Sequence, residues 1–184
     1  MKLLAVIPLL SMCVMSTLRA QAPQSTRTWV GTWAAAQQLP EPDTALPTDD
    51  LRDATLREIV HLSVGGPALR VHLSNAFGAQ ALHLASVHIA RPISPSAARI
   101  DPATDKALTF SGNPDVTIPP GTEYISDPVA YPVVPLSDLA VSLHYDLPPL
   151  EQTGHPGSRT TSYVARGNLA SAADLPEARK VDHW

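Results

Sequence analysis

The chain of 184 residues is poor in several residue types that would otherwise define its class. It has one cysteine, Cys13, and only 5% aromatic residues. A single cysteine cannot form an internal disulfide, so a disulfide framework is excluded. Lysine and arginine number 13 against 17 aspartates and glutamates, and no stretch concentrates positive charge. The charge pattern therefore argues against nucleic acid as a partner.

Long hydrophobic runs are missing except at the N-terminus. Lys2 precedes an apolar run from Leu3 to Val14, and small residues follow at Ala20-Gln21-Ala22. The run is too short to span a bilayer, and the three parts have the order of a secretory signal peptide. We expect residues 1–20 to be removed. The mature domain, residues 21–184, would then be secreted or periplasmic, with no membrane association after signal removal.

A lipid anchor is the alternative fate of this N-terminus. Leu10 to Cys13 faintly resembles a lipoprotein box, but Met12 fills a position that usually requires a small residue. The sequence therefore favours a cleaved signal peptide over lipidation.

Sustained helical periodicity is also lacking. The chain has nineteen prolines, about twice the average share, and all but Pro8 are spread through the mature domain. Proline interrupts helices and is excluded from central strands, so these positions indicate many loops between short strands. The best helix candidate, Thr48 to Ile59, could begin with a cap at Thr48 or Asp49, but its apolar spacing supports only a short helical turn.

Alternating patterns are present instead. Apolar residues recur at even positions in the segment 56–64 (Leu56, Val60, Leu62 and Val64) and at odd positions in the segments 69–73 and 139–145. A period of two with one apolar face is typical of a half-buried antiparallel strand. Several such segments separated by turn signals predict an all-β fold, specifically an antiparallel β-sandwich or jelly roll.

Gly65 and Gly66 separate the first two alternating segments and predict a hairpin between them. A four-residue loop would pair Val64 with Leu69. A two-residue turn would shift the register by two and keep the same faces inward. The sequence leaves both registers open.

A change of phase marks the segment 82–90. Its apolar residues occupy even positions up to Leu84 and odd positions from Val87 onward. One extra residue near Ala85 would explain this shift as a β-bulge. Further along the chain, Pro119-Pro120-Gly121 is a strong turn signal.

Histidines and aspartates provide two weak metal candidates. In the four-residue-loop register His61 would face His72, close enough for two ligands of one metal. Asp101, Asp105 and Asp115 lie in predicted loops and could contribute to a calcium site. No spacing completes either ligand set, so we expect no metal and no other cofactor.

Both usual signatures of a serine hydrolase are absent. The Gly-x-Ser-x-Gly elbow does not occur, and no serine follows Gly-Asp. No Asp-x-x-His occurs either, and Asp182-His183 has the wrong spacing. We therefore expect no catalytic residues in this chain, and an independent esterase with an unfamiliar site is the weaker hypothesis.

Several segments nevertheless resemble the N-terminal region of secreted bacterial SGNH/GDSL-type esterases, a family of lipases, acylhydrolases and carbohydrate esterases. They are WVGTWAAAQ (29–37), TLREIVHLSVGGPALRVHLSNAFG (55–78), SGNPDVTIPPGTEYISDPV (111–129), LSDLAVSLHYDLP (136–148) and the segment 155–168. The resemblance implies a β-sandwich-like domain. In that family an α/β catalytic domain with a Gly-Asp-Ser nucleophile block follows, and this chain contains no such block.

Two functions follow from this resemblance. The first is a non-catalytic N-terminal β-domain of a secreted ester hydrolase, whose parent enzyme would hydrolyse ester bonds in acylated carbohydrates or lipids. Its partner would be the missing C-terminal SGNH catalytic domain. The second is a stand-alone secreted carbohydrate-binding module with a glycan ligand.

Three residues are the candidate glycan contacts: Trp33, Asn75 and Tyr163. Each combines stacking or hydrogen-bonding capacity with a strand-end or loop position. For Trp33 the competing interpretation is an anchor in the core. In the resembling enzymes an apolar strand begins near the position of Trp184, so we also expect the domain 21–184 to lack its last strand and to expose a sheet edge.

Overall fold

The computed structural model describes residues 28–157 and 160–182. The chain divides into two units, Met1–Val30 and Gly31–Trp184, and every helix and strand named below belongs to the second unit. The predicted signal peptide, residues 1–20, and the predicted end of the domain at Trp184 lie outside the described residues.

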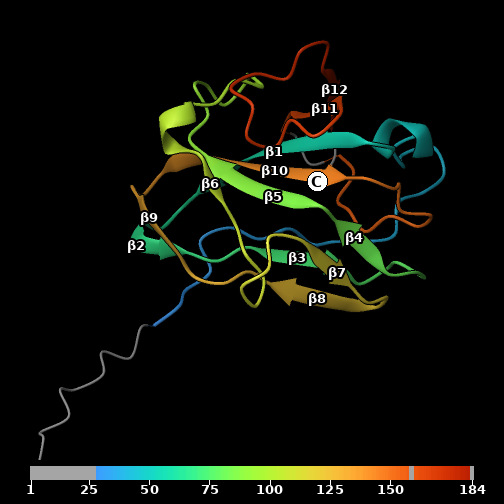
Figure 1. Cartoon of the computed structure of the whole chain (residues 1–184), viewed down its shortest axis with the longest axis horizontal. Coiled ribbons are helices and arrows are strands. Elements are labelled where there is room, and N and C mark those ends of the chain that lie inside the picture. Colours follow the sequence, from blue (N-terminus) through green and yellow to red (C-terminus); the bar gives the residue numbers. More distant parts are fainter. Residues whose placement is uncertain (1–27, 158–159, 183–184) are drawn as a thin grey trace, which may run out of the picture. The chain divides into compact units, whose positions relative to one another are not determined.

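The described part of the chain is all-β, as predicted, with antiparallel strand pairs and two short 3-10 turns (Figure 1). The elements are η1 (Thr48–Leu51), β1 (Ala54–Leu62), β2 (Gly66–Leu69), β3 (His72–Asn75), β4 (Leu82–Leu84), β5 (Ser86–Ala90), η2 (Pro102–Thr104), β6 (Lys106–Ala107), β7 (Val116–Ile118), β8 (Thr122–Ile125), β9 (Val129–Val133), β10 (Ser137–Tyr145), β11 (Ser162–Arg166) and β12 (Arg179–Val181).

One large sheet and three small ladders organise these strands. The large sheet has the order β12-β11-β1-β10-β5-β6, and the ladders are β2-β9, β3-β8 and β4-β7. Leucines, valines and isoleucines from the large sheet and from all three ladders form one apolar cluster, the main core. In the view of Figure 1 the large sheet lies above the ladders β3-β8 and β4-β7. The predicted antiparallel β-sandwich or jelly roll stays a prediction, because three separate two-stranded ladders take the place of a second continuous sheet.

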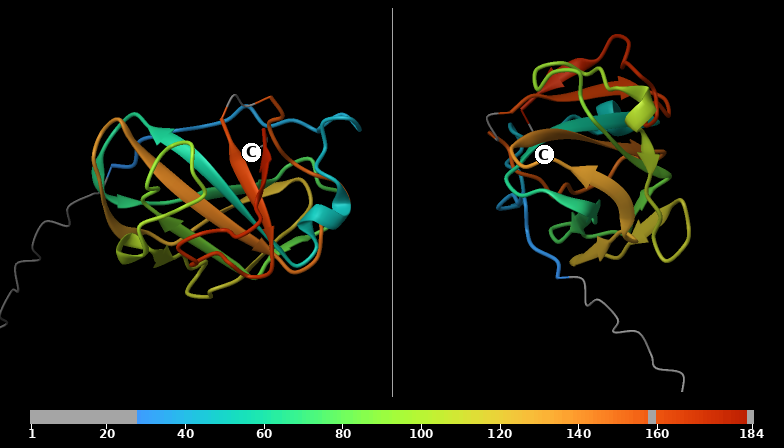
Figure 2. Two further views of the ribbon diagram at one scale, coloured as in Figure 1. Left: turned by 90° about the horizontal axis from the view of Figure 1, so that it is seen from above. Right: turned by 90° about the vertical axis from the view of Figure 1, so that its left-hand side faces the viewer.

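The central strands of the large sheet are buried on both faces, which corrects the prediction of half-buried strands. Leu56 and Val60 of β1 point into the main core, whereas Ile59 joins a second apolar cluster on the opposite face. The segments 91–105 and 167–178 supply Ile100 and Leu175 to that cluster. We call these two segments the covering segments, and Figure 2 shows them crossing the sheet when it is seen from above.

The predicted hairpin around Gly65 and Gly66 is wrong. Strand β1 pairs with β10 and β11, whereas β2 pairs with β9 and β3 with β8. Neither glycine has a positive φ. A Cβ on Gly65 would lie only 2.5 Å from the carbonyl oxygen of Val133, so this glycine permits a close approach of two backbones. His61 consequently does not face His72, and it pairs with Asp138 at 2.8 Å.

Other local predictions have mixed outcomes. The helical turn is confirmed as η1, but Pro47 caps it without a side-chain hydrogen bond. The phase change at Ala85 marks the passage of the chain from ladder β4-β7 to the large sheet, and no bulge within one strand is needed. The turn at Pro119-Pro120-Gly121 is confirmed between β7 and β8, where Gly121 has a φ of 71°.

Candidate functional site

The covered face of the large sheet carries a row of polar side chains that runs from strand to strand. The register places Tyr163 opposite Arg57, Arg57 opposite Ser142, and Ser142 opposite His88. Asp105, at the end of η2, joins the row through His88. We call these five residues the polar band. Its four members on the sheet lie beneath the covering segments, where alternation alone predicted exposure to solvent, and Asp105 reaches them from the first covering segment.

Arg57 is the centre of the polar band and is 0% exposed. Its Nε donates to the Ser142 hydroxyl at 2.7 Å, and one terminal nitrogen donates to the Ala98 carbonyl at 2.6 Å. The other terminal nitrogen lies within hydrogen-bond distance of the carbonyls of Leu169 (3.1 Å), Ala170 (3.2 Å) and Ala172 (2.9 Å). A buried guanidinium is tolerated when its donors are satisfied in this way.

Burial lowers the pKa of Arg57 to about 10, although the carboxylates of Asp105 and Asp174 partly oppose that shift. The side chain therefore remains a cation at neutral pH. Because its acceptors lie on both covering segments, Arg57 fastens both of them to the sheet.

Three members of the polar band have the composition of a Ser-His-Asp triad. His88 Nδ1 lies 3.0 Å from both oxygens of Asp105, and Ser142 is the cross-strand neighbour of His88. In a working triad the serine hydroxyl transfers its proton to histidine and faces a bound substrate. Here Ser142 is 2% exposed, its oxygen accepts the Arg57 bond, and no hydrogen bond to His88 forms within the described residues. This geometry serves a structural network and leaves no access for an ester.

A second row of polar side chains lies two residues along the strands from the polar band, on the same face, and also holds a covering segment. The Thr55 hydroxyl donates to the Gly167 carbonyl at 2.7 Å and accepts from the Leu169 amide at 2.8 Å. Ser86 donates to the Asn168 side chain at 3.2 Å. His144, buried between Thr55 and Ser86 in register, bonds through Nδ1 to the Ala54 carbonyl at 3.1 Å. The covered face is thus closed by hydrogen bonds along its length.

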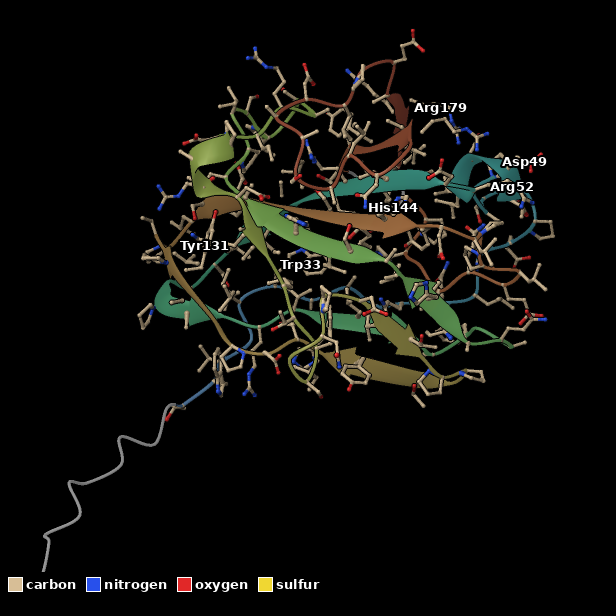
Figure 3. The ribbon with its side chains drawn as sticks, viewed as in Figure 1. Trp33, Asp49, Arg52, Tyr131, His144 and Arg179 are labelled. Carbon is tan, nitrogen blue, oxygen red and sulfur yellow. The ribbon has the colours of Figure 1, made fainter. Side chains whose placement is uncertain are left out.

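The structure does not bring the three predicted glycan contacts together. Trp33 packs, partly buried, against the main core (Figure 3). Tyr163 is 3% exposed and belongs to the second cluster, and its hydroxyl has no hydrogen-bond partner within the described residues. A sugar needs an exposed ring face for stacking, which Tyr163 does not offer in this arrangement. Glycan contact through these residues stays a prediction.

Asn75, the third predicted contact, is 2% exposed and closes a turn. Its amide donates to the carbonyls of Gln80 at 2.8 Å and Ile118 at 3.0 Å. A Cβ on Gly78 would lie 1.9 Å from the Asn75 side-chain oxygen, so the glycine of Ser-Asn-Ala-Phe-Gly makes room for that asparagine. Asn75 therefore has a framework role here.

Asp127 plays a similar part in the segment 111–129. Its carboxylate accepts from the Gly112 amide at 2.8 Å, the Thr109 hydroxyl at 2.7 Å and the Ser111 amide at 3.2 Å. The Gly112 bond, followed by the Thr109 bond, holds the pKa of Asp127 below its ordinary value. Ser111 and Gly112 both have positive φ, so this aspartate clamps a tight turn.

The predicted calcium residues are engaged separately. Asp101 caps η2, Asp105 binds His88, and Asp115 lies 3.3 Å from His83 Nε2. His83 also contacts Asp146, with 3.0 Å from Nδ1 to the nearer oxygen, and this bond is the main cause that raises the pKa of His83. Within the described ranges no group of three or more acidic, histidine or cysteine side chains is arranged to hold a metal ion.

Glu58 is a polar exception on the core face of the large sheet. It pairs in register with Val141 of the main core, and no hydrogen bond or ion pair reaches its carboxyl from the described residues. Burial raises the pKa of Glu58 to about 8. Continuing the β1-β11 register by one residue sets Ser162 opposite Glu58, and the Ser162 hydroxyl is likewise buried without a described partner.

No protein-family model and no curated protein matches this chain. In the part of the chain that the structure describes, no helix has the length and apolar character needed to cross a membrane.

Proposed function

We propose that this chain is a non-catalytic β-domain of a secreted SGNH/GDSL-type ester hydrolase, whose chemistry resides in a separate SGNH domain. The parent enzyme would hydrolyse ester bonds in acylated carbohydrates or lipids. The sequence resemblance across five segments motivates the proposal, and the roles of the residues inside those segments support it.

The sealed polar band is the observation that carries the proposal. Ser142, His88 and Asp105 have the composition of a catalytic triad, but the Ser142 hydroxyl accepts a hydrogen bond from Arg57. In the other resembling segments, Asn75 and Asp127 hold turns. Residues of a catalytic machinery would be expected at an accessible surface, whereas these maintain a framework.

Hydrolysis of p-nitrophenyl acetate tests the non-catalytic half of the proposal. The purified chain of residues 21–184 is expected to match the buffer rate, and Ser142→Ala is expected to give the same trace. Turnover that survives purification and disappears in Ser142→Ala, or after replacement of any other single serine, would overturn the proposal.

The reading frame next to this coding sequence tests the other half. A Gly-Asp-Ser block followed by Asp-x-x-His, joined in frame or encoded beside it, is expected. The joined protein should hydrolyse the ester, and replacement of the serine in that block should abolish the activity. A frame that encodes an unrelated fold would contradict the proposed partnership.

A stand-alone carbohydrate-binding module is the second candidate. Trp29 is 41% exposed and could present a ring face for stacking on a sugar. Titration with xylan, chitin and pectin oligomers tests this alternative. Saturable binding that Trp29→Ala or Trp33→Ala weakens would favour it over the first proposal.

A further inference from the structure

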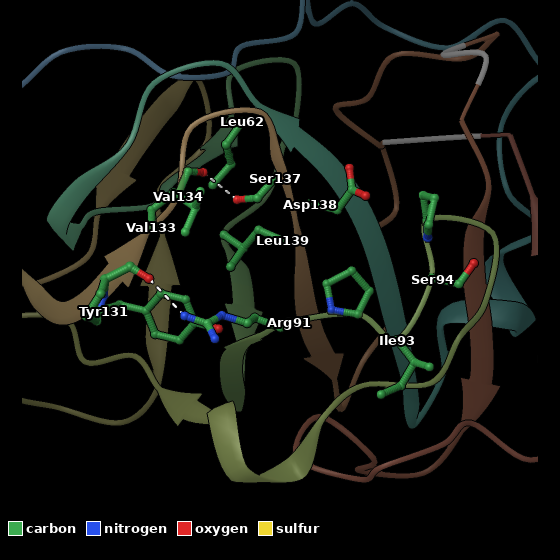
Figure 4. A pocket seen from close by; sticks show the side chains of 13 residues that line it. Leu62, Arg91, Ile93, Ser94, Tyr131, Val133, Val134, Ser137, Asp138 and Leu139 are labelled. Carbon is green, nitrogen blue, oxygen red and sulfur yellow. Dashed lines mark hydrogen bonds between the residues drawn. The ribbon is translucent and has the colours of Figure 1, made fainter.

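A cleft of ≈ 350 Å³ opens at the end of the large sheet where β1 finishes and β10 begins (Figure 4). This volume lies at the small end of the range of ligand pockets in proteins. Leu62 and Leu139, both buried, form part of its lining together with Val133 of β9. The cleft is separate from the polar band, and none of the residues in that band lines it.

The walls of the cleft are aliphatic and remain open to solvent. Ile93 is 59% exposed and Val134 is 64% exposed, and both line the cleft. Prolines 92, 95 and 132 complete much of the rest of the wall. Exposed apolar side chains gathered around a hollow mark a binding surface more often than scattered ones do.

One cation projects into this aliphatic setting. Arg91 lines the cleft and, in Figure 4, lies between its Tyr131 side and its Ile93 side. Its terminal nitrogen donates to the Pro132 carbonyl at 3.3 Å, and none of the ion pairs among the described residues involves Arg91. The nearby carboxylates of Asp101 and Asp105 have other partners, since Asp101 caps η2 and Asp105 binds His88.

A histidine holds the one carboxylate among the described residues that line the cleft. This carboxylate belongs to Asp138 and lies 2.8 Å from His61 Nδ1. The lining therefore offers an aliphatic surface with one guanidinium available for an anion. A guanidinium presents donors in a fork that matches a carboxylate.

We propose that this cleft binds a medium-chain aliphatic carboxylate, with the chain against Leu62, Leu139 and Val133 and the carboxylate on Arg91. A pyranose fits the lining less well, because sugar sites rely on exposed aromatic faces, and Tyr131 is buried. The inference does not depend on the proposed ester-hydrolase partnership, because it concerns the lining of this cleft alone.

Octanoate, octanol and xylotriose are the probes for an NMR titration of the purified chain. Octanoate is expected to shift amide signals of residues 91–95 and 131–139 in a saturable manner, with octanol shifting the same signals more weakly. Arg91→Gln is expected to weaken octanoate binding by about tenfold or more and to leave octanol binding unchanged, because a hydrogen bond to a charged group is lost. Arg91→Lys keeps the charge and should retain most of the affinity.

Arg52→Gln is the matched control, since Arg52 is exposed, pairs with Asp49 at 3.6 Å and does not line the cleft. Amide spectra that are unchanged away from the substituted residue would show that each variant is folded. The inference is wrong if octanoate fails to saturate, if Arg91→Gln binds as well as the native chain, or if xylotriose and not octanoate shifts these signals.

Discussion

The two faces of the large sheet are built from the same strands by different means. On the core face, side chains such as Leu56 and Leu143 pack against the ladders. On the covered face, Arg57 and Thr55 hold the covering segments by hydrogen bonds to main-chain groups. Packing tolerates conservative changes of shape, whereas a buried hydrogen-bond network loses several partners when one member is removed. The covered face should therefore be the more sensitive of the two to a single polar substitution.

The largest expected effect comes from Arg57→Met. This change removes the donor for the Ser142 hydroxyl and for carbonyls on both covering segments, and leaves them buried without partners. We expect the free energy of unfolding to fall by about 3 kcal/mol or more. Urea denaturation measures it, with exposed Arg52→Met as the control expected to change stability by less than about 0.5 kcal/mol. An equal effect of both substitutions would contradict the special role of the covered face.

The next effect concerns the ladder side of the core, at Gly65. Gly65→Ala would place a Cβ 2.5 Å from the Val133 carbonyl and 2.6 Å from the Pro135 ring, so the ladder β2-β9 must shift. We expect a loss of about 1–3 kcal/mol. Gly66→Ala meets nothing closer than 3.9 Å and is the matched control, expected to be near neutral in the same thermal melts. Similar melting of the two variants would refute the close-approach role of Gly65.

Glu58 tests the polar exception on the core face through pH. Its pKa is about 8 in the folded protein and near 4.5 when unperturbed, so between these values folding requires a proton that the unfolded chain has released. The protonated Glu58 carboxyl therefore makes its full contribution to the free energy of unfolding below about pH 4.5. That contribution is lost as the pH rises toward about 8, and above this value the free energy of unfolding no longer changes through Glu58. Glu58→Gln should flatten this pH dependence. The free energy of unfolding of the variant, relative to that of the native chain, should rise by about 1–2 kcal/mol as the pH is raised from 5 to 8.5.

The control for this pH series is Glu123→Gln, because Glu123 is exposed on β8. Its stability curve should run parallel to that of the native chain. A native curve that does not decline between pH 5 and pH 8.5, or a decline that persists in Glu58→Gln, would show that Glu58 is not the group responsible.

The smallest effect belongs to His83, at the surface between β4, Asp115 and the end of β10. Its pKa is raised, chiefly by the hydrogen bond with Asp146, so its contribution is fully present below the pKa of the unfolded chain and is lost as the pH rises through the folded value. Because the side chain is more than one third exposed, we expect His83→Gln to cost only about 0.5 kcal/mol at pH 5.5 and nothing at pH 8.5. If His83→Gln lowers the free energy of unfolding equally at both pH values, His83 stabilises the protein by packing and not by its charge.

The sequence predicted local strand structure better than strand partners. The segment 139–145 lies within β10 and the phase change at Ala85 separates β4 from β5, because alternation and its interruption depend on adjacent residues. The strand that pairs with β1 was not predicted. That strand is β10, which lies far along the chain, whereas the two glycines after β1 suggested pairing with the next segment. Pairing between distant strands leaves no signal in the spacing of either strand.

The covered face was beyond prediction for a related reason. Arg57 and Ser142 alternate with apolar residues, as side chains facing solvent do, and the covering segments carry no periodicity of their own. His88 and Asp105 sit 17 positions apart with nothing between them that indicates contact. Asn75 belongs to the Ser-Asn-Ala-Phe-Gly motif in the sequence, but its role in a turn depends on the position of Gly78 in space.

Amide hydrogen exchange of the native chain and of Arg57→Lys tests the central claim, that the guanidinium fork holds the covering segments on the sheet. Lysine keeps the charge and loses the fork. We predict faster exchange in segments 91–100 and 167–173, where the Ile100 amide bonds to the Ala173 carbonyl at 2.9 Å, and unchanged exchange in the ladders β3-β8 and β4-β7. Unchanged protection of the covering segments, or an equal acceleration in the ladders, would contradict the account.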